Sequence, residues 1–413
     1  MLWRKAASTR VTHDDTSPWW LGEALTVGSE GLTLDGVPLA SVAARHGTPL
    51  YVYGAATVRR RFAQLRDALG TTGIACRVHY AMKANRFPPL LALVRAEGDV
   101  AIDACSPCEV SAALAAGFRA DEISVTASML SRRDLAVFAE QRPHLNLDTR
   151  SALRRWRETP GHAPRIGLRI DPGVAVGWGD EPKLRYGNSK FGLDAEALLD
   201  TVAYAESLGL EVDTLHVHVG WGLQTNAAPL LAQVYDRLAA WARQIPTLRV
   251  LNVGGGLCSQ QRPEDRPLPL QLWARLLRDH LGPVCRDRGL TIACEPGTFV
   301  VAAAGVLIAE INTIETRASG TWVGLDTGHN ANMYAAHYGI PLAIVPVHRP
   351  LDPPAGPVHV AGNLNEANDM FARDLHLPAL AEGDLVALWP AGAYGAAMAS
   401  NHCMRGLPTE VLI

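Results

Sequence analysis

Short apolar runs alternate with amphipathic segments from Leu50 to Val300. The runs have the length and the apolar content of buried strands, and the segments between them repeat apolar residues at helical spacing. Strands are predicted at Cys76–Met82, Asp99–Ala104, Ile123–Thr126, His144–Asp148, Arg165–Asp171, Thr214–Val219, Arg249–Val253 and Thr291–Glu295. Helices are predicted at Thr57–Leu69, Phe87–Glu97, Arg132–Gln141, Ala195–Leu208, Pro229–Gln244 and Leu270–Arg288. This alternation predicts a (β/α)8 barrel, whose active site would lie at the carboxyl ends of the strands.

The pattern changes after Val301 to apolar runs that proline and glycine separate. Strands are predicted at Ala303–Glu315, Thr321–Asp326, Pro341–Val347, Val358–Ala361 and Leu385–Leu388, with a short helix at Asn365–Leu375. We expect a β-sandwich or β-barrel domain that strands near Leu25–Leu39 complete. The predicted division is 1–48 for N-terminal strands that join the β domain, 49–305 for the barrel and 306–413 for the C-terminal β domain.

The composition is that of a globular protein, because 48% of the 413 residues are hydrophobic and 19% are charged. This length is too great for one ordinary core, which agrees with two domains. A net charge of -3 gives no electrostatic footprint for nucleic acid. No apolar stretch is long enough to span a bilayer, and Met1–Trp20 lacks the apolar core of a signal peptide. We therefore expect a cytoplasmic protein without nucleic-acid or membrane partners.

The cysteines favour the same compartment, because their number, seven, is odd and they are scattered along the chain. Cys105 and Cys108 form a single CxxC pair. Zinc or redox chemistry would need a second pair or a thioredoxin context, and neither is evident. We interpret the pair as a loop that holds two thiols and expect no metal site there.

Lys83 is the most informative residue, since it follows the predicted strand Cys76–Met82. A lysine at the end of a buried strand is costly unless it is paired or reactive. Desolvation makes a lysine lose its proton more easily, and the neutral amine is the form that attacks an aldehyde. The position predicts a Schiff-base lysine for pyridoxal 5'-phosphate.

Other strand ends supply groups for the remaining parts of that cofactor. Glu295 ends the eighth strand, where a carboxylate can keep a pyridine nitrogen protonated. Gly254–Gly256 follow the seventh strand, where a backbone without side chains can bring N–H groups to a phosphate. His216 and His218 point the same way from a strand, and one could cover the face of a pyridine ring. The alternative, zinc on the two histidines, has no third ligand at a suitable spacing.

The sequence resembles the fold-type III pyridoxal-phosphate decarboxylases, the group of diaminopimelate and ornithine decarboxylases, and is most similar to the diaminopimelate branch. The resemblance runs from about Pro49 to Leu412. It rests on YAMKAN at 80–85, SPCEVSAALAAGF at 106–118, LRIDPGV at 168–174, SKFGL at 189–193, HVHVG at 216–220, GGG at 254–256, EPG at 295–297, NEAND at 365–369, GAYGAAMASN at 392–401 and TEVL at 409–412.

The resemblance implies a role for each residue of the site. Lys83 would carry the cofactor, Glu295 would pair with the ring nitrogen and His218 would stack on the ring. The cofactor site would be completed by Asp103, Arg169, Gly254, Gly255, Gly256 and Tyr394. The active sites of the family form at a homodimer interface, where the loop with Asn365, Glu366 and Asp369 would reach the partner's site.

The departures from the family pattern concern substrate recognition. Thr298 stands where the family has an arginine, and a second arginine is missing from 332–338, where Tyr338 aligns with the family's tyrosine. The two arginines would bind the carboxylate at the far end of the substrate, and each lost charge-assisted hydrogen bond costs on the order of 1.5–3 kcal/mol. The bulk of Trp178, Trp221 and Tyr334 could line a different distal pocket or form core.

A further departure concerns the proton donor. Asn365 replaces a cysteine that donates a proton in some relatives. An amide is not a useful acid, so Lys83 or a water held by Glu366 is left as the donor, with Cys403 and His402 as more distant alternatives.

These observations predict a decarboxylase for an amino acid other than diaminopimelate, including one attached to something larger, in a specialised pathway such as that of a siderophore. One alternative is diaminopimelate decarboxylation in lysine biosynthesis, with Lys183, Arg185 or Arg317 replacing the missing arginines. Another is a racemase on the same barrel, which would use Lys83 and a tyrosine from the partner. A cofactor-binding protein without catalysis is the third.

Overall fold

The computed structural model describes residues 18–174, 176–178 and 189–413. Eight parallel strands close into a barrel, because the last of them, β13 (Thr291–Cys294), pairs with the first, β5 (Cys76–Ala81). The other strands, in order around the barrel, are β6 (Val100–Ala104), β7 (Ile123–Thr126), β8 (His144–Leu147), β9 (Arg165–Asp171), β11 (Glu211–Val217) and β12 (Val250–Asn252). The predicted fold class is confirmed, and every predicted barrel strand overlaps an observed one.

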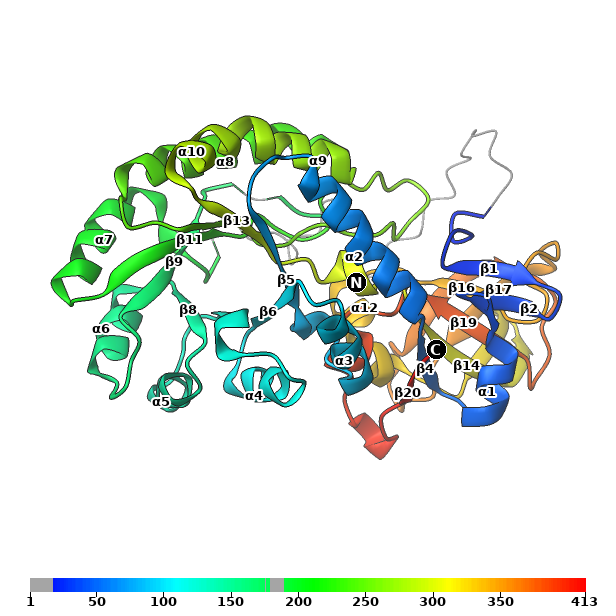
Figure 1. The fold of residues 1–413 in the computed structure, drawn as a ribbon. Coiled ribbons are helices and arrows are strands. Elements are labelled where there is room, and N and C mark those ends of the chain that lie inside the picture. Colours follow the sequence, from blue (N-terminus) through cyan, green and yellow to red (C-terminus); the bar gives the residue numbers. More distant parts are fainter. Residues whose placement is uncertain (1–17, 175, 179–188) are drawn as a thin grey trace.

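Helices cover the outside of the barrel (Figure 1). They are α2 (Ala55–Gly70), α3 (Pro88–Ala96), α4 (Pro107–Ala115), α5 (Arg132–Gln141), α6 (Arg150–Glu158), α7 (Leu198–Ser207), α8 (Ala228–Gln244), α9 (Leu270–Leu276) and α10 (Gly282–Arg288). Ser131 shows why α5 begins where it does: its hydroxyl accepts the backbone N–H of Asp134, and the carboxylate of Asp134 accepts that of Ser131. A π-helical segment, Leu277–Leu281, joins α9 and α10, so the helix predicted at 270–288 is one continuous helix with a wide turn.

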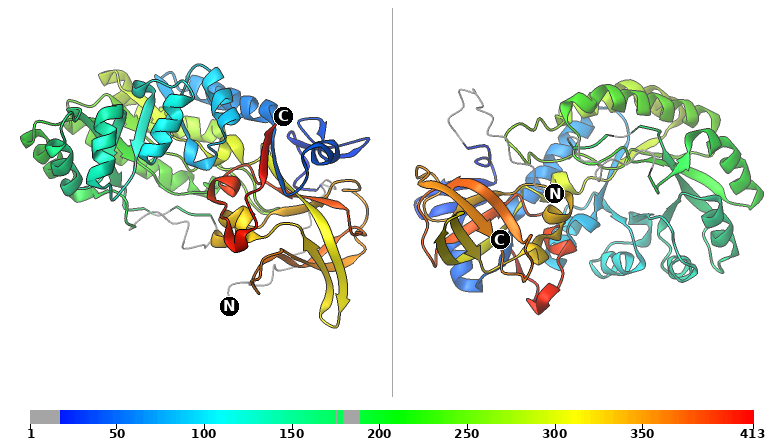
Figure 2. Two further views of the ribbon diagram at one scale, coloured as in Figure 1. Left: turned by 90° about the horizontal axis from the view of Figure 1, so that it is seen from below. Right: turned by 180° about the vertical axis from the view of Figure 1, so that it is seen from behind.

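The second domain lies beside the barrel on the side of α2 and α3 in all views (Figures 1 and 2). Its strands are β4 (Leu50–Tyr53), β14 (Gly305–Arg317), β15 (Gly320–Leu325), β16 (Ala343–Pro346), β17 (Gly356–Ala361), β18 (Met370–Leu377), β19 (Leu385–Trp389) and β20 (Thr409–Leu412). The chain therefore enters this sheet at β4, leaves to form the barrel and returns at β14, and β4 pairs with both β14 and β20.

The N-terminal strands form a small sheet of their own that packs on the second domain. They are β1 (Leu25–Gly28), β2 (Gly31–Leu34) and β3 (Val37–Pro38), followed by α1 (Leu39–His46). Leu32 donates its backbone N–H to Val347 O at 2.7 Å, and Leu25, Leu32 and Leu34 share an apolar core with residues of β14, β16 and β19. The proposed division into 1–48, 49–305 and 306–413 stays a prediction.

The helix predicted at Asn365–Leu375 is wrong, because the second half of that stretch is the strand β18, which pairs with β17. The first half is a turn around the buried Asp369, whose carboxylate accepts the backbone N–H groups of Leu364 and His329. A side chain that satisfies backbone groups in this way stabilises a turn at the expense of a helix.

Candidate active site

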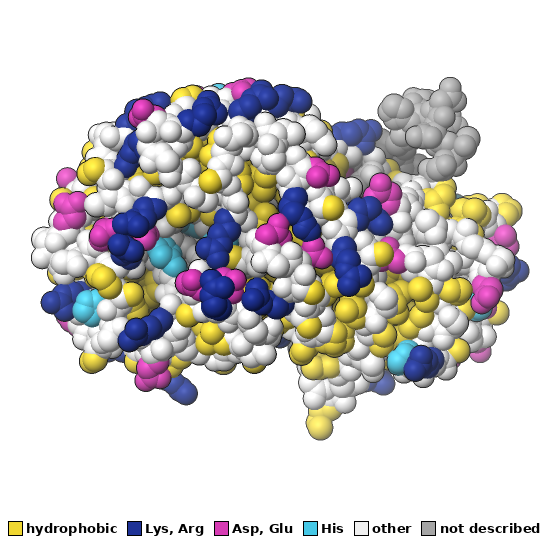
Figure 3. Space-filling view, in the orientation of Figure 1, with side chains coloured by type: hydrophobic (Ala, Val, Ile, Leu, Met, Phe, Trp, Pro, Cys, Tyr) yellow, Lys and Arg dark blue, Asp and Glu magenta, His cyan; other side chains and the backbone are white. Residues whose placement is uncertain are grey.

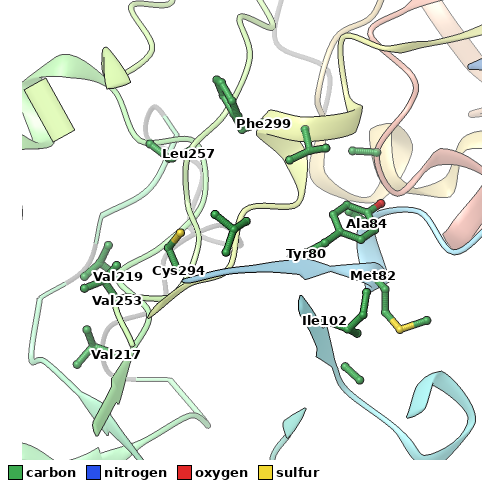
Figure 4. Packing of buried hydrophobic residues seen from close by; sticks show 14 of the residues in the cluster. Tyr80, Met82, Ala84, Ile102, Val217, Val219, Val253, Leu257, Cys294 and Phe299 are labelled. Atoms are coloured by element: carbon green, nitrogen blue, oxygen red, sulfur yellow. The ribbon is translucent and has the colours of Figure 1, made fainter. Parts of the chain in front are cut away.

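Lys83 lies in a short helical turn, Met82–Ala84, that follows β5. Its neighbours Met82 and Ala84 are fully buried among apolar side chains near the ends of the barrel strands (Figure 4), which fixes the turn. The lysine side chain keeps 42% of its surface accessible, and its Nζ lies 3.0 Å from Asp103 Oδ2 and 3.6 Å from Cys105 Sγ. The side chain is therefore anchored at its base and held at its end by Asp103 of β6, and part of its surface remains accessible to a small molecule.

The charges of Lys83 and Asp103 depend on each other. Burial lowers the pKa of Lys83, but the carboxylate of Asp103, with smaller contributions from Cys105, Tyr394 and Glu295, raises it well above its ordinary value. Burial and the charge of Glu295 raise the pKa of Asp103 to about 7, against the effect of Lys83. The expectation that desolvation alone would lower the pKa of this lysine is wrong, because its carboxylate partner outweighs burial.

Glu295 follows β13 and is 5% exposed. Its Oε2 lies 3.0 Å from His216 Nε2, and its Oε1 accepts a hydrogen bond from Asn252 Nδ2 at 2.7 Å. Burial raises the pKa of this carboxyl, but the interaction with His216, helped by Lys83 and His79, lowers it below its usual range. The structure therefore presents an ionised carboxylate whose two oxygens are both held.

The glycine turn after β12 is fixed against the neighbouring strand ends. Gly254 and Gly256 have positive φ, and a Cβ at these positions would lie 2.5 Å from Val217 O and 2.7 Å from Gly220 O. A side chain is therefore excluded at Gly254 and Gly256 both by the backbone conformation and by the nearby carbonyl oxygens. Gly254 donates its N–H to Asn252 Oδ1 and Gly255 donates to His218 Nδ1, so a phosphate would rely on Gly256 and on the shape of the turn.

Arg169 and Tyr394 reach the same end of the barrel from distant parts of the chain. Arg169 is buried in β9, and its guanidinium lies 4.4 Å from the centre of the Phe191 ring. Tyr394 has positive φ, begins the helix α13 (Gly395–Met398) and donates its backbone N–H to Ala84 O at 2.6 Å. The β domain thereby places Tyr394 next to Lys83.

The predicted substrate residues Tyr334 and Tyr338 belong to an aromatic cluster, and Thr298 is bonded to it. It consists of Trp178, Trp221, Tyr334 and Ile340, with Tyr338 and Tyr394 packed against it. Trp221 Nε1 donates to Thr298 Oγ1 at 3.0 Å, and the centres of the Tyr334 and Tyr394 rings are 4.8 Å apart. The cluster therefore extends from the neighbourhood of Lys83 to Trp178, whose Nε1 binds Asp265.

The predicted residues of the partner loop lie in the β domain. Asp369 is buried and its carboxylate serves the backbone turn described above, so within its own subunit it has a structural role. Glu366 is exposed and pairs with His402 at 2.9 Å, and Asn365 beside it is also exposed. Neither carboxylate bonds to Lys83 or Glu295 in the described part of the chain, and a reach into a second subunit stays a prediction.

Sequence reasoning did not assign the partners that hold Lys83 and Glu295. Asn252 stands directly before the glycine turn, and its two hydrogen bonds link that turn to Glu295. The sequence predicts for Cys105 only a loop that holds two thiols, but the structure places its Sγ beside the lysine amine, and burial raises its pKa to about 12. The described residues contain no cluster of three or more potential metal ligands, and none of the described helices could cross a bilayer.

The comparisons with known proteins agree with this geometry. Residues 55–302 match the pyridoxal-binding domain of the pyridoxal-dependent decarboxylases. The chain is 32% identical to a diaminopimelate decarboxylase of Methanothermobacter thermautotrophicus, covering 92% of this chain and 90% of the relative, and 32% identical to one of Streptomyces coelicolor, covering 92% and 88%. A diaminopimelate decarboxylase structure from M. jannaschii in complex with L-lysine superposes with a TM-score of 0.85 at 26% identity, covering 95% of this chain and 93% of the other.

Proposed function

Since this chain belongs to the pyridoxal-dependent decarboxylases, we propose that Lys83 carries the cofactor and that the enzyme removes the α-carboxylate of an amino acid as carbon dioxide. Pyridoxal phosphate is its cofactor, and decarboxylation is its reaction class. The observation that carries the assignment of residues is the accessible Lys83 amine, which shares one strand edge with the ionised Glu295. The racemase alternative and the alternative without catalysis have no support from these relatives.

The residues present fit the cofactor. Lys83 offers an accessible amine, and the turn at Gly254–Gly256 offers a surface that no side chain could share. When bound, the protonated pyridine ring accepts the electron pair that the departing carboxylate leaves. Glu295 would offer its negative charge to that ring nitrogen, and Arg169 and His218 would complete the polar walls of the site. Asp103 holds the lysine amine in place from β6.

Diaminopimelate is the substrate that the relatives favour. Both reported relatives are named diaminopimelate decarboxylase, and the similarity covers nearly their whole length. This supports diaminopimelate, the alternative substrate, better than the predicted specialised substrate. Of the cations considered as replacements for the missing arginines, Lys183 and Arg185 lie outside the described residues. Arg317 ends β14, where it packs on Trp322 in the β domain.

A second candidate is an amino acid without a distal carboxylate. The observation in its favour is the hydrogen bond from Trp221 to Thr298, because it uses the only donor of the indole ring within an aromatic surface, and neither side chain carries a positive charge for an anion. Such a surface suits an uncharged or a larger conjugated group. The difference between the two candidates is therefore the chemistry at the far end of the substrate.

Carbon dioxide release from meso-diaminopimelate, with lysine measured beside it, tests the first candidate. Turnover at about 1–10³ per second would support diaminopimelate. The absence of turnover in a protein that binds the cofactor through Lys83 would favour the second candidate. Lys83→Ala is the control for binding in both arms, and amino acids without a distal carboxylate would then be assayed.

We also propose that the enzyme is a homodimer with shared active sites. A red segment close to the C-terminal end of the sequence projects from the lower edge of the molecule in Figure 1, and the tip of this projection is hydrophobic in Figure 3. In this part of the chain Met404 and Leu407 are 88% and 64% exposed. The salt bridge from His402 to Glu366 joins this segment to the predicted partner loop. Exposed apolar side chains on a projection favour a protein interface. Sedimentation of the wild type and of Met404→Glu tests this, because a dimer should dissociate in the variant and a monomer should not change.

A further inference from the structure

Two neighbouring strands brace the carboxylate of Glu295. His216 of β11 and Asn252 of β12 are paired residues in the parallel register, so their side chains reach Glu295 side by side. His216 is fully buried and lies 3.0 Å from Oε2, and Asn252 donates to Oε1 at 2.7 Å. Thr126 Oγ1 lies at 3.5 Å from the same Oε1. The carboxylate therefore cannot rotate without losing a buried hydrogen bond.

The surroundings of His216 identify its tautomer. Its Nδ1 is buried and has no hydrogen-bond partner in the described part of the chain. A protonated Nδ1 would leave a donor unsatisfied in the protein interior, which is more costly than an unprotonated nitrogen. Burial also lowers the pKa of His216 below its ordinary value, with Glu295 opposing. Near neutral pH His216 is thus a neutral imidazole whose single N–H lies on Nε2 and points at Glu295. The attraction between a charged His216 and Glu295, which contributes most to lowering the pKa of Glu295, acts only at pH values low enough to protonate His216.

We propose that His216 is a positioning residue: its neutral imidazole donates one hydrogen bond to Glu295 and keeps that carboxylate ionised and aimed at the ring nitrogen of the cofactor. The inference rests on the proposed role of Glu295. A neutral donor stabilises the anion without supplying a competing cation, so the full negative charge of Glu295 remains available to the ring. An imidazolium at this position would neutralise that charge.

Other titratable groups face this pair, and each contributes to its pH dependence. They are His79 and Lys83 from β5 and its following turn, Asp103 from β6, Arg169 from β9 and His218 from the segment after β11. The His216 contribution must therefore be isolated by a difference between variants.

The test compares His216→Phe, which removes the donor, with His216→Gln, which retains one. His144→Phe is the matched control, because His144 also pairs with a carboxylate, Asp213, at 2.7 Å but stands at the start of β8. We expect His216→Phe to lower kcat about 10–100-fold with little change in KM. The pH at which the absorbance of the bound cofactor changes should move in His216→Phe, recover in His216→Gln and stay unchanged in His144→Phe.

Unfolding of the cofactor-free protein gives a reading that is independent of catalysis. In the wild type the pKa of Glu295 is lowered, so its contribution to stability is present above the unfolded value. In His216→Phe burial should raise that pKa, so the variant should lose more stability at pH 8 than at pH 5. An unchanged pH dependence together with an unchanged cofactor spectrum would overturn the proposal. If Glu295→Gln instead kept the wild-type cofactor spectrum, the proposed role of Glu295 toward the cofactor would be refuted. The pH-dependent loss of stability in cofactor-free His216→Phe would still be observed in that case, so the two failures can be distinguished.

Discussion

The two sides of the site at the strand ends are built from different chemistry. Around Glu295, buried polar groups from β11, β12 and β13 satisfy one another through short hydrogen bonds. Around Thr298, the rings of Trp178, Trp221 and Tyr334 pack edge to face, and one hydrogen bond joins Trp221 to Thr298. The first side fixes charge, because a misplaced charge in the interior is costly. The second fixes shape, and a change there alters which molecule fits.

Lys83→Ala should have the largest effect on activity, and it should leave the aromatic side around Thr298 unchanged. We expect activity to fall by at least about 10⁴-fold, because the amine that forms the covalent link is lost. Carbon dioxide release and the absorbance of the bound cofactor measure this. Lys190→Ala is the matched control, since Lys190 is exposed and its amine lies over the ring of Phe191. Comparable loss in both variants would show that Lys83 has no special role.

Glu295→Gln should lower kcat by about 10²–10³-fold, the usual cost of losing one preorganised charge in a site. The amide can keep the contact with His216 but carries no negative charge, so substrate binding should change little. Steady-state kinetics separates kcat from KM. A change confined to KM would place Glu295 on the recognition side and would break the comparison between the two sides.

Some positions could be predicted from the sequence because a single segment carries their signal. Lys83 closely follows a buried strand, and Gly254 and Gly256 occupy turn positions that only glycine tolerates, so each prediction needed only the local sequence. The partners of Glu295 could not, because His216 and Asn252 meet it only through the pairing of three strands. The turn at Asp369 was mistaken for a helix because its cause is a contact with the backbone of His329.

The hydrogen bond between Trp221 and Thr298 sharpens the comparison on the recognition side. Thr298→Val leaves Trp221 Nε1 buried without an acceptor, which should reduce the free energy of unfolding by about 1–3 kcal/mol. The double variant Thr298→Val, Trp221→Phe removes both partners and should cost less than the sum of the two single changes. Denaturant unfolding measures all four proteins. Strict additivity would contradict a direct bond between the two side chains.

Asp103 tests the charged side without the cofactor. Its pKa is raised to about 7, chiefly by burial, above the unfolded value of 3.8. A carboxyl with a raised folded pKa contributes stability at low pH and loses it as the pH rises through the folded value. The cofactor-free wild type should therefore lose stability between pH 4 and pH 7 relative to Asp103→Asn, which cannot ionise. Denaturant unfolding of both proteins across this range measures the difference, and Lys83 stays protonated throughout it. Parallel pH profiles of the two proteins would mean that Lys83 keeps Asp103 ionised at all these pH values. The pair would then be a fixed salt bridge, and Asp103 would not titrate near neutral pH.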